Sequence, residues 1–357
     1  MDEGRPTSGI EELQLAARNH GMPLEALRYD VTPAGLHYLL IHYDIPAVDA
    51  AEWRLSIDGA VERPLTLSLD DLRARPSETL AVTLECAGNG RALLEPHVES
   101  QPWLVEAVGT AAWTGTPLAP ILREAGVAGG VPEILFTGLD HGVDHGVEQD
   151  YQRSLALADA MGDDVLLAYA MNGEPLPPQH GFPLRLVVPG WYGMAHVKWL
   201  SSITALTESF DGYQMRETYR IWRAGAEDAD AGEAVTRILP RSLISPPGFP
   251  DFYSRRRIVD RGEVRMEGRA WSGLAPIERV EVSVDDGAAW ADAKLGALPG
   301  SPYAWRSWSF EWDAEPGDHV LSSRATDATG ATQPLRPEWN RGGFQNNAVH
   351  RVPVSVR

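Results

Sequence analysis

The stretch TLECAGNGR, residues 83–91, contains Cys86, the only cysteine of the 357-residue chain. An intramolecular disulfide is therefore impossible. The apolar run from Leu80 to Leu84 predicts a strand, and the small residues Ala-Gly-Asn-Gly after Cys86 predict a tight turn. This order places a thiol at the end of a strand, where a backbone without bulky side chains approaches a ligand closely. Arg91 adds a fixed positive charge nearby.

A lone cysteine is most often a small buried hydrophobic residue. Two glycines and an asparagine directly after it favour instead a loop shaped around an oxyanion, a soft metal or the substrate of a nucleophile. A cysteine-nucleophile hydrolase is a further alternative, but no histidine lies within the motif to act as its base.

The composition sets the frame for these alternatives. With 43% hydrophobic and 23% charged residues the chain can bury a core, and its length predicts two domains. Its formal net charge of −19 argues against nucleic acid and against an anionic membrane as partners, so an anionic ligand needs a local basic pocket. No apolar run reaches the roughly 18 to 20 residues of a membrane span, and residues 1–6 lack a signal-peptide pattern. We therefore expect a cytoplasmic location, or a periplasmic one if a leader precedes this sequence.

The pattern of predicted secondary structure changes after about residue 225. Before that point strands and helices alternate, beginning with an amphipathic helix over Ile10–Arg18 and including a helix opened by a capping-box pattern at Ser68. An acidic, alanine-rich segment, 224–234, predicts a linker. From about residue 235 short alternating runs between Gly, Pro and Asp clusters predict a β-sandwich, with strands over Val264–Trp271, Val280–Val284, Trp305–Trp312, His319–Ala325 and Ala348–Val356. Its core is expected to include Trp271, Trp290, Trp305, Trp308 and Trp312.

The motif around Cys86 resembles the molybdenum-ligand motif of the sulfite oxidase family, whose usual form is T-L-x-C-A-G-N-R-R. Further segments match that family in order and spacing, from about His37 to Val352. The resemblance implies an α+β protein: a mixed α/β molybdopterin-binding domain over residues 1–225, followed by an immunoglobulin-like dimerisation domain over 235–357. It also implies a Mo-molybdopterin cofactor with Cys86 as the metal ligand. No C-x-x-C-H haem motif occurs in the sequence, so we expect a haem-free form.

The same resemblance predicts a cofactor-binding set. Residues 37–46 match the family loop F-x-V-R-N-H-x-x-V-P, which lies against the cofactor and here contributes Tyr38 and His42. The Gly-Leu-Asp segment ending at Asp140 matches the aspartate that bonds the pterin. Isolated basic residues usually form a solvated face, but those of residues 171–199 are spaced as in the family's molybdopterin-binding segment. The residues predicted there are His180, Arg185, His196, Val197 and Lys198.

The substrate side is predicted from the same comparison. Arg91 and Arg351 are expected to hold an anion, and Trp103 to line the substrate pocket, although core packing is the usual fate of a tryptophan. Tyr219 occupies the position of the family tyrosine beside the metal's oxo ligand, where it can donate a hydrogen bond or relay a proton; a core tyrosine is the alternative. The family's substrate arginine is replaced by Leu40, which takes a two-pronged donor out of the pocket.

The expected function is therefore oxidation of sulfite, or a related small oxyanion, to sulfate at a molybdenum centre. The electron acceptor is not determined by the sequence, with O2 and a cytochrome as the candidates. A homodimer formed through the C-terminal domain is the expected assembly. Alternatives are nitrate or S-oxide reduction on the same fold and a non-catalytic scaffold that has lost molybdenum. A separate metal site over Asp140–His145 is a further alternative, but loops rich in Asp, His and Gly are usually turns.

Overall fold

The computed structural model describes residues 9–223, 225 and 231–357. The chain divides into two compact units, each of which is discontinuous in sequence. The sandwich unit comprises Met1–Tyr38, Ala81–Thr110 and Arg237–Arg357, and the α/β unit comprises Leu39–Leu80 and Ala111–Thr236. Most of the predicted linker 224–234, and the segment 1–6 considered as a signal, lie outside the described residues. The predicted domain boundary between residues 225 and 235 stays a prediction, because these units are not continuous segments.

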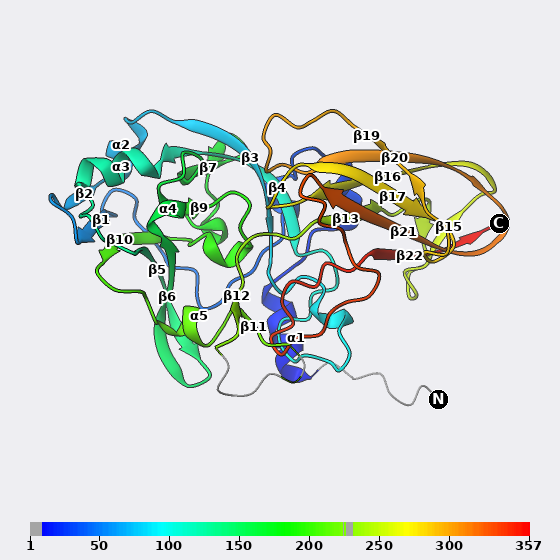
Figure 1. The fold of residues 1–357 in the computed structure, drawn as a ribbon, viewed down its shortest axis with the longest axis horizontal. Helices are drawn as coiled ribbons and strands as arrows, with labels where there is room; N and C mark the ends of the chain where they lie inside the picture. Colours follow the sequence, from blue (N-terminus) through cyan, green and yellow to red (C-terminus); the bar gives the residue numbers. More distant parts are fainter. Residues whose placement is uncertain (1–8, 224, 226–230) are drawn as a thin grey trace. The chain divides into compact units, whose positions relative to one another are not determined.

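The α/β unit contains a five-stranded sheet in the order β2-β1-β10-β5-β6 (Figure 1). Strands β1 and β10 pair in parallel and the other neighbours pair antiparallel. The strands are β1 (Leu55–Gly59), β2 (Leu65–Leu67), β5 (Glu133–Asp144), β6 (Val147–Ala156) and β10 (Leu200–Leu206). The ladder between β5 and β6 is interrupted between Thr137 and His141, which redirects the side chains at that point.

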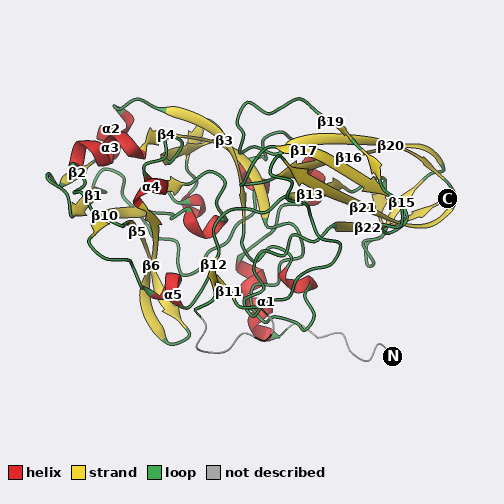
Figure 2. Cartoon of the chain, in the orientation of Figure 1, coloured by secondary structure: helices red, strands yellow, loops and turns green. Residues whose placement is uncertain are grey.

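A second sheet has the order β3-β4-β7-β8, with β9 also paired to β7. Its strands are β3 (Glu78–Glu85), β4 (Val108–Pro117), β7 (Leu166–Met171), β8 (Glu174–Pro175) and β9 (Arg185–Val187). Strands β3 and β4 each begin in one unit and end in the other. A small ribbon joins β11 (Arg220–Ile221) to β12 (Glu233–Ala234). Figure 2 shows that strands predominate over short helices.

Capping residues in the local sequence mark where several helices begin or end. The predicted helix over Ile10–Arg18 is α1, with the same bounds. Helix α2 (Leu69–Arg73) opens with the predicted capping box, in which Ser68 Oγ accepts from Asp71 N at 3.1 Å and Asp71 Oδ2 accepts from Ser68 N at 2.9 Å. Helix α3 (Leu118–Ala125) ends at Gly126, whose φ of +70° favours glycine. The remaining helices are α4 (Leu157–Ala160) and α5 (Tyr213–Arg216), and the 3-10 turns are η1 (Leu24–Arg28), η2 (Ala34–Leu36), η3 (Arg91–Leu93), η4 (Pro178–His180) and η5 (Gly193–Ala195).

One hydrophobic core fills the α/β unit. Leu55 and Ile57 of β1, Phe136 of β5 and Ile203 of β10 are at most 1% exposed, and Leu122 of α3 packs in the same cluster. Alternation along β1, and along β10 from Ser202 onward, sends every second side chain into this core, which fixes the register of the sheet.

The sandwich unit contains two further sheets, in the orders β13-β16-β20-β19 and β14-β15-β22-β21-β17-β18 (Figure 1). The five predicted strands are confirmed with small shifts at their ends, as β16 (Gly262–Trp271), β17 (Ile277–Ser283), β20 (Arg306–Ala314), β21 (Gly317–Asp327) and β22 (His350–Val356). The others are β13 (Arg241–Ser245), β14 (Phe249–Pro250), β15 (Arg257–Val259), β18 (Ala291–Asp292) and β19 (Lys294–Leu295). The immunoglobulin-like topology stays a prediction.

Residues from both sheets share one core, and four of the five expected tryptophans are buried in this unit. Trp308 and Trp312 lie in the core cluster. Trp271 and Trp305 are buried beside it, with ring centroids 6.2 Å apart. Trp290 differs from the expectation, because it is only half-buried and packs under the Arg324 guanidinium at 4.5 Å. In the part of the chain that the structure describes, no helix is both long and apolar enough to cross a membrane.

Candidate functional site

Cys86 directly follows β3, and residues 87–90 form the predicted turn. The backbone holds this turn at both ends, since Cys86 N donates to Ala107 O at 2.9 Å and Asn89 N donates to Cys86 O at 3.0 Å. Gly90 has φ +92°, and a Cβ at this position would lie 2.8 Å from the side chain of Asn346. The turn therefore requires glycine there for both conformation and space. Cys86 itself is 6% exposed.

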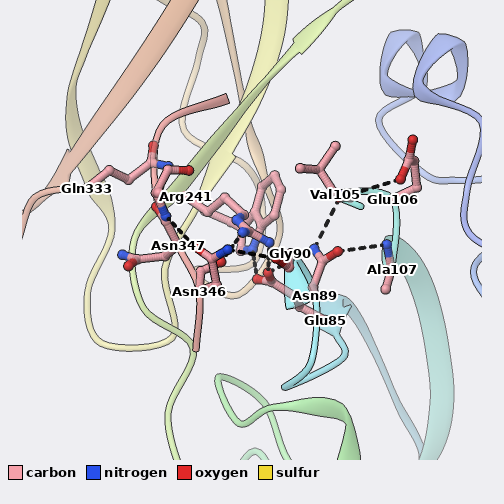
Figure 3. A network of polar contacts seen from close by, with 12 residues as sticks. Glu85, Asn89, Gly90, Val105, Glu106, Ala107, Arg241, Gln333, Asn346 and Asn347 are labelled. Atoms are coloured by element: carbon pink, nitrogen blue, oxygen red, sulfur yellow. Dashed lines mark hydrogen bonds and ion pairs between the residues drawn. The ribbon is translucent and has the colours of Figure 1, made fainter. Parts of the chain in front are cut away.

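The motif asparagine ties the turn to the segment that precedes β4 (Figure 3). Asn89 Nδ2 donates to Glu85 Oε1 at 3.0 Å and to Val105 O at 3.1 Å, while Asn89 Oδ1 accepts from Ala107 N at 3.1 Å. A side chain with both donor and acceptor ends can make this link, which an aliphatic residue of the same size cannot. The asparagine of the motif is thus part of the framework around Cys86.

Arg91 lies folded against the same turn and is 5% exposed. Its Nε donates to Gly342 O at 3.1 Å, its NH1 donates to Gln101 O at 3.4 Å, and its guanidinium lies 5.0 Å from the centroid of the Phe344 ring. A Cβ at Gly88 would lie 2.7 Å from that guanidinium. The first glycine of the motif therefore makes room for the arginine.

The environment of the thiol acts in two directions. Burial raises the pKa of Cys86, whereas the Arg91 charge, the Gly88 N–H and the indole N–H of Trp103 lower it. Trp103 is 5% exposed, so it packs in the same buried surroundings. A buried sulfur close to a cation suits coordination to a soft metal, because the metal displaces the thiol proton.

In the α/β unit the predicted basic residues do come together. Arg185 NH1 donates to His180 O at 3.1 Å and Arg185 NH2 to His196 O at 3.3 Å, and the guanidinium lies 4.6 Å from the Trp113 ring centroid. Lys198 Nζ donates to Leu40 O at 2.7 Å and lies 4.3 Å from a ring centroid of Trp199. A rigid fork and a point charge in one unit are the donors that a phosphate-bearing cofactor needs.

His196 belongs to this group through its backbone. Its Nδ1 accepts from Val188 N at 3.1 Å, so the proton is on Nε2, which donates to Trp191 O at 3.1 Å. Burial and the nearby Arg185 lower the pKa of His196 to about 3, so the ring is neutral. Both ring nitrogens are engaged by the protein, and the adjacent Val197 is fully buried. Any contact of this pair with a cofactor therefore comes from the backbone.

Asp140 provides the observation that tests the fit of molybdopterin to this unit. It lies in the interrupted part of β5 and is 3% exposed, and its Oδ1 has no hydrogen-bond partner among the described residues. Burial raises its pKa to about 6, against the opposing charge of Lys198. A buried acceptor that the protein leaves unsatisfied is costly unless a ligand provides donors. The amino and ring N–H groups of a pterin are such donors, so the residues present fit the cofactor.

Tyr219 and His42 form a short contact in the same unit. His42 Nε2 and the Tyr219 hydroxyl are 2.6 Å apart, and the His42 ring stacks on Tyr151 with centroids 4.8 Å apart. Burial lowers the pKa of His42 to about 3, with smaller contributions from Lys198 and Arg153. The imidazole is therefore neutral, and its Nε2 can either donate a hydrogen bond to the phenol or accept one from it.

Three further positions were predicted or compared, namely Arg351, Tyr38 and Leu40. Arg351 is on β22, where its Nε donates to Asp286 Oδ1 at 2.7 Å and its side chain is 38% exposed. Tyr38 is buried in the sandwich unit and stacks on His37 at 5.2 Å, whereas His42 belongs to the α/β unit. Leu40 is half-buried. The predicted roles of Arg351 and Tyr38 stay predictions.

The Asp140–His145 segment does not form a separate metal site. His141 directs both ring nitrogens to carboxylates of β6, with Nδ1 2.8 Å from Asp150 and Nε2 3.1 Å from Glu148. Hydrogen bonds to these carboxylates raise the pKa of His141, which favours a cation over a metal ligand. Across residues 9–223, 225 and 231–357 no group of three or more His, Cys, Asp or Glu side chains could hold a metal ion.

Sequence reasoning missed two features. Tyr151 and Arg153 of β6 surround the His42 and Tyr219 pair, with the Arg153 guanidinium 5.3 Å from the Tyr219 ring centroid. Residues separated by one position on a strand share one face, but no strand was predicted over this segment. The contact between Glu85 and Arg241 was also missed, because the two residues lie far apart in the sequence.

Comparison with known proteins places this geometry in a family. Residues 42–214 match the family model of the oxidoreductase molybdopterin binding domain, and residues 242–357 match that of the Mo-co oxidoreductase dimerisation domain. Sulfite oxidase of Gallus gallus is 34% identical over 342 residues, which cover 90% of this chain and 72% of that protein. Mitochondrial sulfite oxidase of Mus musculus is 35% identical over 345 residues, covering 91% and 62%.

Two further relatives carry other names. NADH nitrate reductase 1 of Oryza sativa subsp. japonica is 32% identical over 394 residues, covering 99% of this chain and 42% of that protein. The crystal structure of the sulfane dehydrogenase SoxCD from Paracoccus pantotrophus superposes with a TM-score of 0.81 and 25% identity, covering 100% and 95% of the two chains. The chain spans about 62% of the length of the mammalian sulfite oxidases. It belongs to the sulfite oxidase family of molybdopterin-dependent oxidoreductases.

Proposed function

We propose that this chain is a molybdenum-dependent oxidoreductase that oxidises a small sulfur-centred substrate, with sulfite as the first substrate to test. The observation that carries this proposal is the buried Cys86 thiol at the end of β3, in a turn shared with the buried Arg91, whose charge lowers the pKa of the thiol against the effect of burial. The unsatisfied carboxylate oxygen of Asp140 and the Arg185 and Lys198 donors support cofactor binding by the α/β unit. A scaffold that had lost molybdenum would need none of these groups.

Each group has a defined task in this proposal. The molybdenum cofactor, when bound, supplies an exchangeable oxo group and a centre that accepts two electrons. Cys86 provides the protein ligand, Asp140 accepts pterin N–H groups, and Arg185 and Lys198 hold the phosphate. Arg91 orients the anion, and Tyr219 donates a hydrogen bond while the neutral His42 fixes its hydroxyl. In the overall balance sulfite gains an oxygen that derives from water, and two protons and two electrons leave, the electrons to an external acceptor.

Leu40 distinguishes this chain from the usual family pattern. The family carries an arginine at the position of Leu40, whose side chain is aliphatic. The Leu40 carbonyl accepts a hydrogen bond from Lys198 Nζ. A charged hydrogen bond is worth about 1.5 to 3 kcal/mol, so its absence predicts a KM for sulfite raised by about tenfold or more. A substrate with less negative charge at the reacting sulfur is favoured by the same change.

A second candidate is oxidation of sulfane-type sulfur. It is favoured by the aliphatic Leu40 together with the TM-score of 0.81 against a sulfane dehydrogenase. Nitrate reduction is a third candidate, favoured by the match of the rice nitrate reductase over 99% of this chain. The dimerisation-domain match over residues 242–357 supports a homodimer.

The test is a molybdenum assay of protein expressed in a cofactor-competent host, followed by a substrate panel. Sulfite and a sulfane-sulfur compound are oxidised with ferricyanide as acceptor, and nitrate and an S-oxide are reduced with a dye donor. We expect stoichiometric molybdenum and turnover of a sulfur substrate. Protein that folds but contains no molybdenum would refute the proposal, and turnover of nitrate alone would replace its substrate class.

A further inference from the structure

Glu85, the residue directly before Cys86, carries a buried carboxylate with three side-chain donors (Figure 3). Its side chain is 3% exposed. Oε1 accepts from Arg241 NH1 at 2.5 Å and from Asn89 Nδ2 at 3.0 Å, and Oε2 accepts from Trp271 Nε1 at 2.8 Å. Both oxygens are thus engaged inside the protein, one position away from the thiol.

The two donors that come from far along the chain are neighbours in the sandwich. Arg241 begins β13 and Trp271 ends β16, and the two residues lie directly opposite each other in that antiparallel pair. Side chains at directly opposed positions lie on the same face of a sheet, so the pair is presented to Glu85 together. Arg241 is 2% exposed and also donates to Asn346 O. Both donor side chains are buried, so protein contacts rather than solvent hold them in place.

The segment around Asn346 binds the other side of the Cys86 turn. Asn346 Nδ2 donates to Gly90 O at 2.7 Å, and Gln345 N donates to Ala87 O at 2.8 Å. Arg241 therefore contacts both Glu85 and the segment that holds the turn. Other groups of the sandwich unit therefore bind the chain both before Cys86, at Glu85, and after it, at Gly90.

We infer that Arg241 and Trp271 are positioning residues for the sulfur of Cys86, acting through Glu85. The inference rests on the proposed role of Cys86 as the molybdenum ligand. Removing Arg241 leaves a buried carboxylate without its cation, and such a group reorients toward water because an unpaired buried charge is strongly disfavoured. Movement of Glu85 moves the end of β3 and therefore the direction in which the adjacent thiol points.

The first test uses the whole 357-residue chain without cofactor and needs no activity measurement. Because Cys86 is the only cysteine, the rate of reaction with DTNB under native conditions reports on this thiol alone. We expect Arg241→Met to raise the labelling rate by about tenfold or more, since labelling follows local opening. Trp271→Phe keeps an aromatic ring, removes one donor to Glu85 and should produce a smaller rise of the same kind.

The matched control is Arg257→Met. Arg257 is 6% exposed and donates to three backbone carbonyls, Pro247 O at 2.8 Å, Gly248 O at 3.0 Å and Pro246 O at 3.3 Å. Its loss also removes a buried arginine of the sandwich unit but none of the contacts to Glu85. We expect an unchanged labelling rate in Arg257→Met. Equal rates in wild type and Arg241→Met, or equal rises in Arg241→Met and Arg257→Met, would overturn the inference; if Arg241→Met fails to fold, Trp271→Phe decides by the same criterion.

The second readout is the Mo(V) EPR spectrum of the loaded enzyme. We expect changed g-values and a lower kcat with little change in KM in Arg241→Met, and a wild-type spectrum in Arg257→Met. The two proposals fail separately. Protein without molybdenum but with faster labelling in Arg241→Met refutes the proposed function and keeps the anchoring of Cys86, whereas molybdenum binding with unchanged labelling refutes the anchoring alone.

Discussion

Replacing Asp140 by asparagine should stabilise the cofactor-free protein against unfolding. The same change should weaken binding of the cofactor. The carboxylate is 3% exposed and its Oδ1 has no partner among the described residues, so its charge is disfavoured in the folded state. Burial raises its pKa from 3.8 to about 6. At 1.36 kcal/mol per pKa unit this corresponds to roughly 3 kcal/mol of stability lost at neutral pH. Asparagine has the same shape and no charge, so it should recover most of that amount.

The raised pKa of Asp140 determines how the stability of the protein changes with pH. Between pH 3.8 and about 6 the folded protein holds the Asp140 proton and the unfolded chain has lost it, so the stability of the wild type falls as the pH rises through this window. Asp140→Asn lacks this dependence. The difference in the free energy of unfolding should therefore be small near pH 4, increase up to about pH 6 and stay constant above it.

Urea unfolding of the cofactor-free protein at several pH values measures this difference. Asp163→Asn is the control, because that carboxylate is 99% exposed and its removal should change little. In protein expressed with the cofactor, Asp140→Asn should contain less molybdenum than the wild type, since a pterin N–H acceptor has become part donor. If Asp140→Asn is no more stable than the wild type at pH 8, the reasoning on this buried charge is wrong.

Three further predictions concern the substrate side and the metal ligand. Leu40→Arg should lower the KM for sulfite by about tenfold or more with little change in kcat, because it adds a charged donor, and steady-state kinetics with ferricyanide would show an unchanged KM if this is wrong. Cys86→Ser should remove the molybdenum–sulfur bond to the protein, seen in X-ray absorption, together with turnover; retained turnover would contradict the assignment. Gly88→Ala should raise the KM for sulfite, since the new Cβ would lie 2.7 Å from the Arg91 guanidinium and displace it, whereas Gly35→Ala, with open space around the Cβ, should leave the KM as it is.

The amino-acid sequence by itself determined the local elements and the family. Helix α1 has the predicted bounds and α2 has the predicted capping box, because caps and periodicity act over a few residues. The strands of the sandwich unit follow from alternation and turn residues for the same reason. The nonapeptide around Cys86 was specific enough to identify the family, which the two family models confirm.

The tertiary structure alone decided what surrounds each functional side chain. Glu85 and Arg241 are 156 positions apart, and no local pattern pairs them. Trp290 resembles its core neighbours in sequence but lies half-buried under Arg324. His196 is neutral because it is buried beside Arg185. The charge, partners and burial of a side chain depend on chain segments that meet only after folding, whereas its tendency to form helix, strand or turn depends on its immediate neighbours.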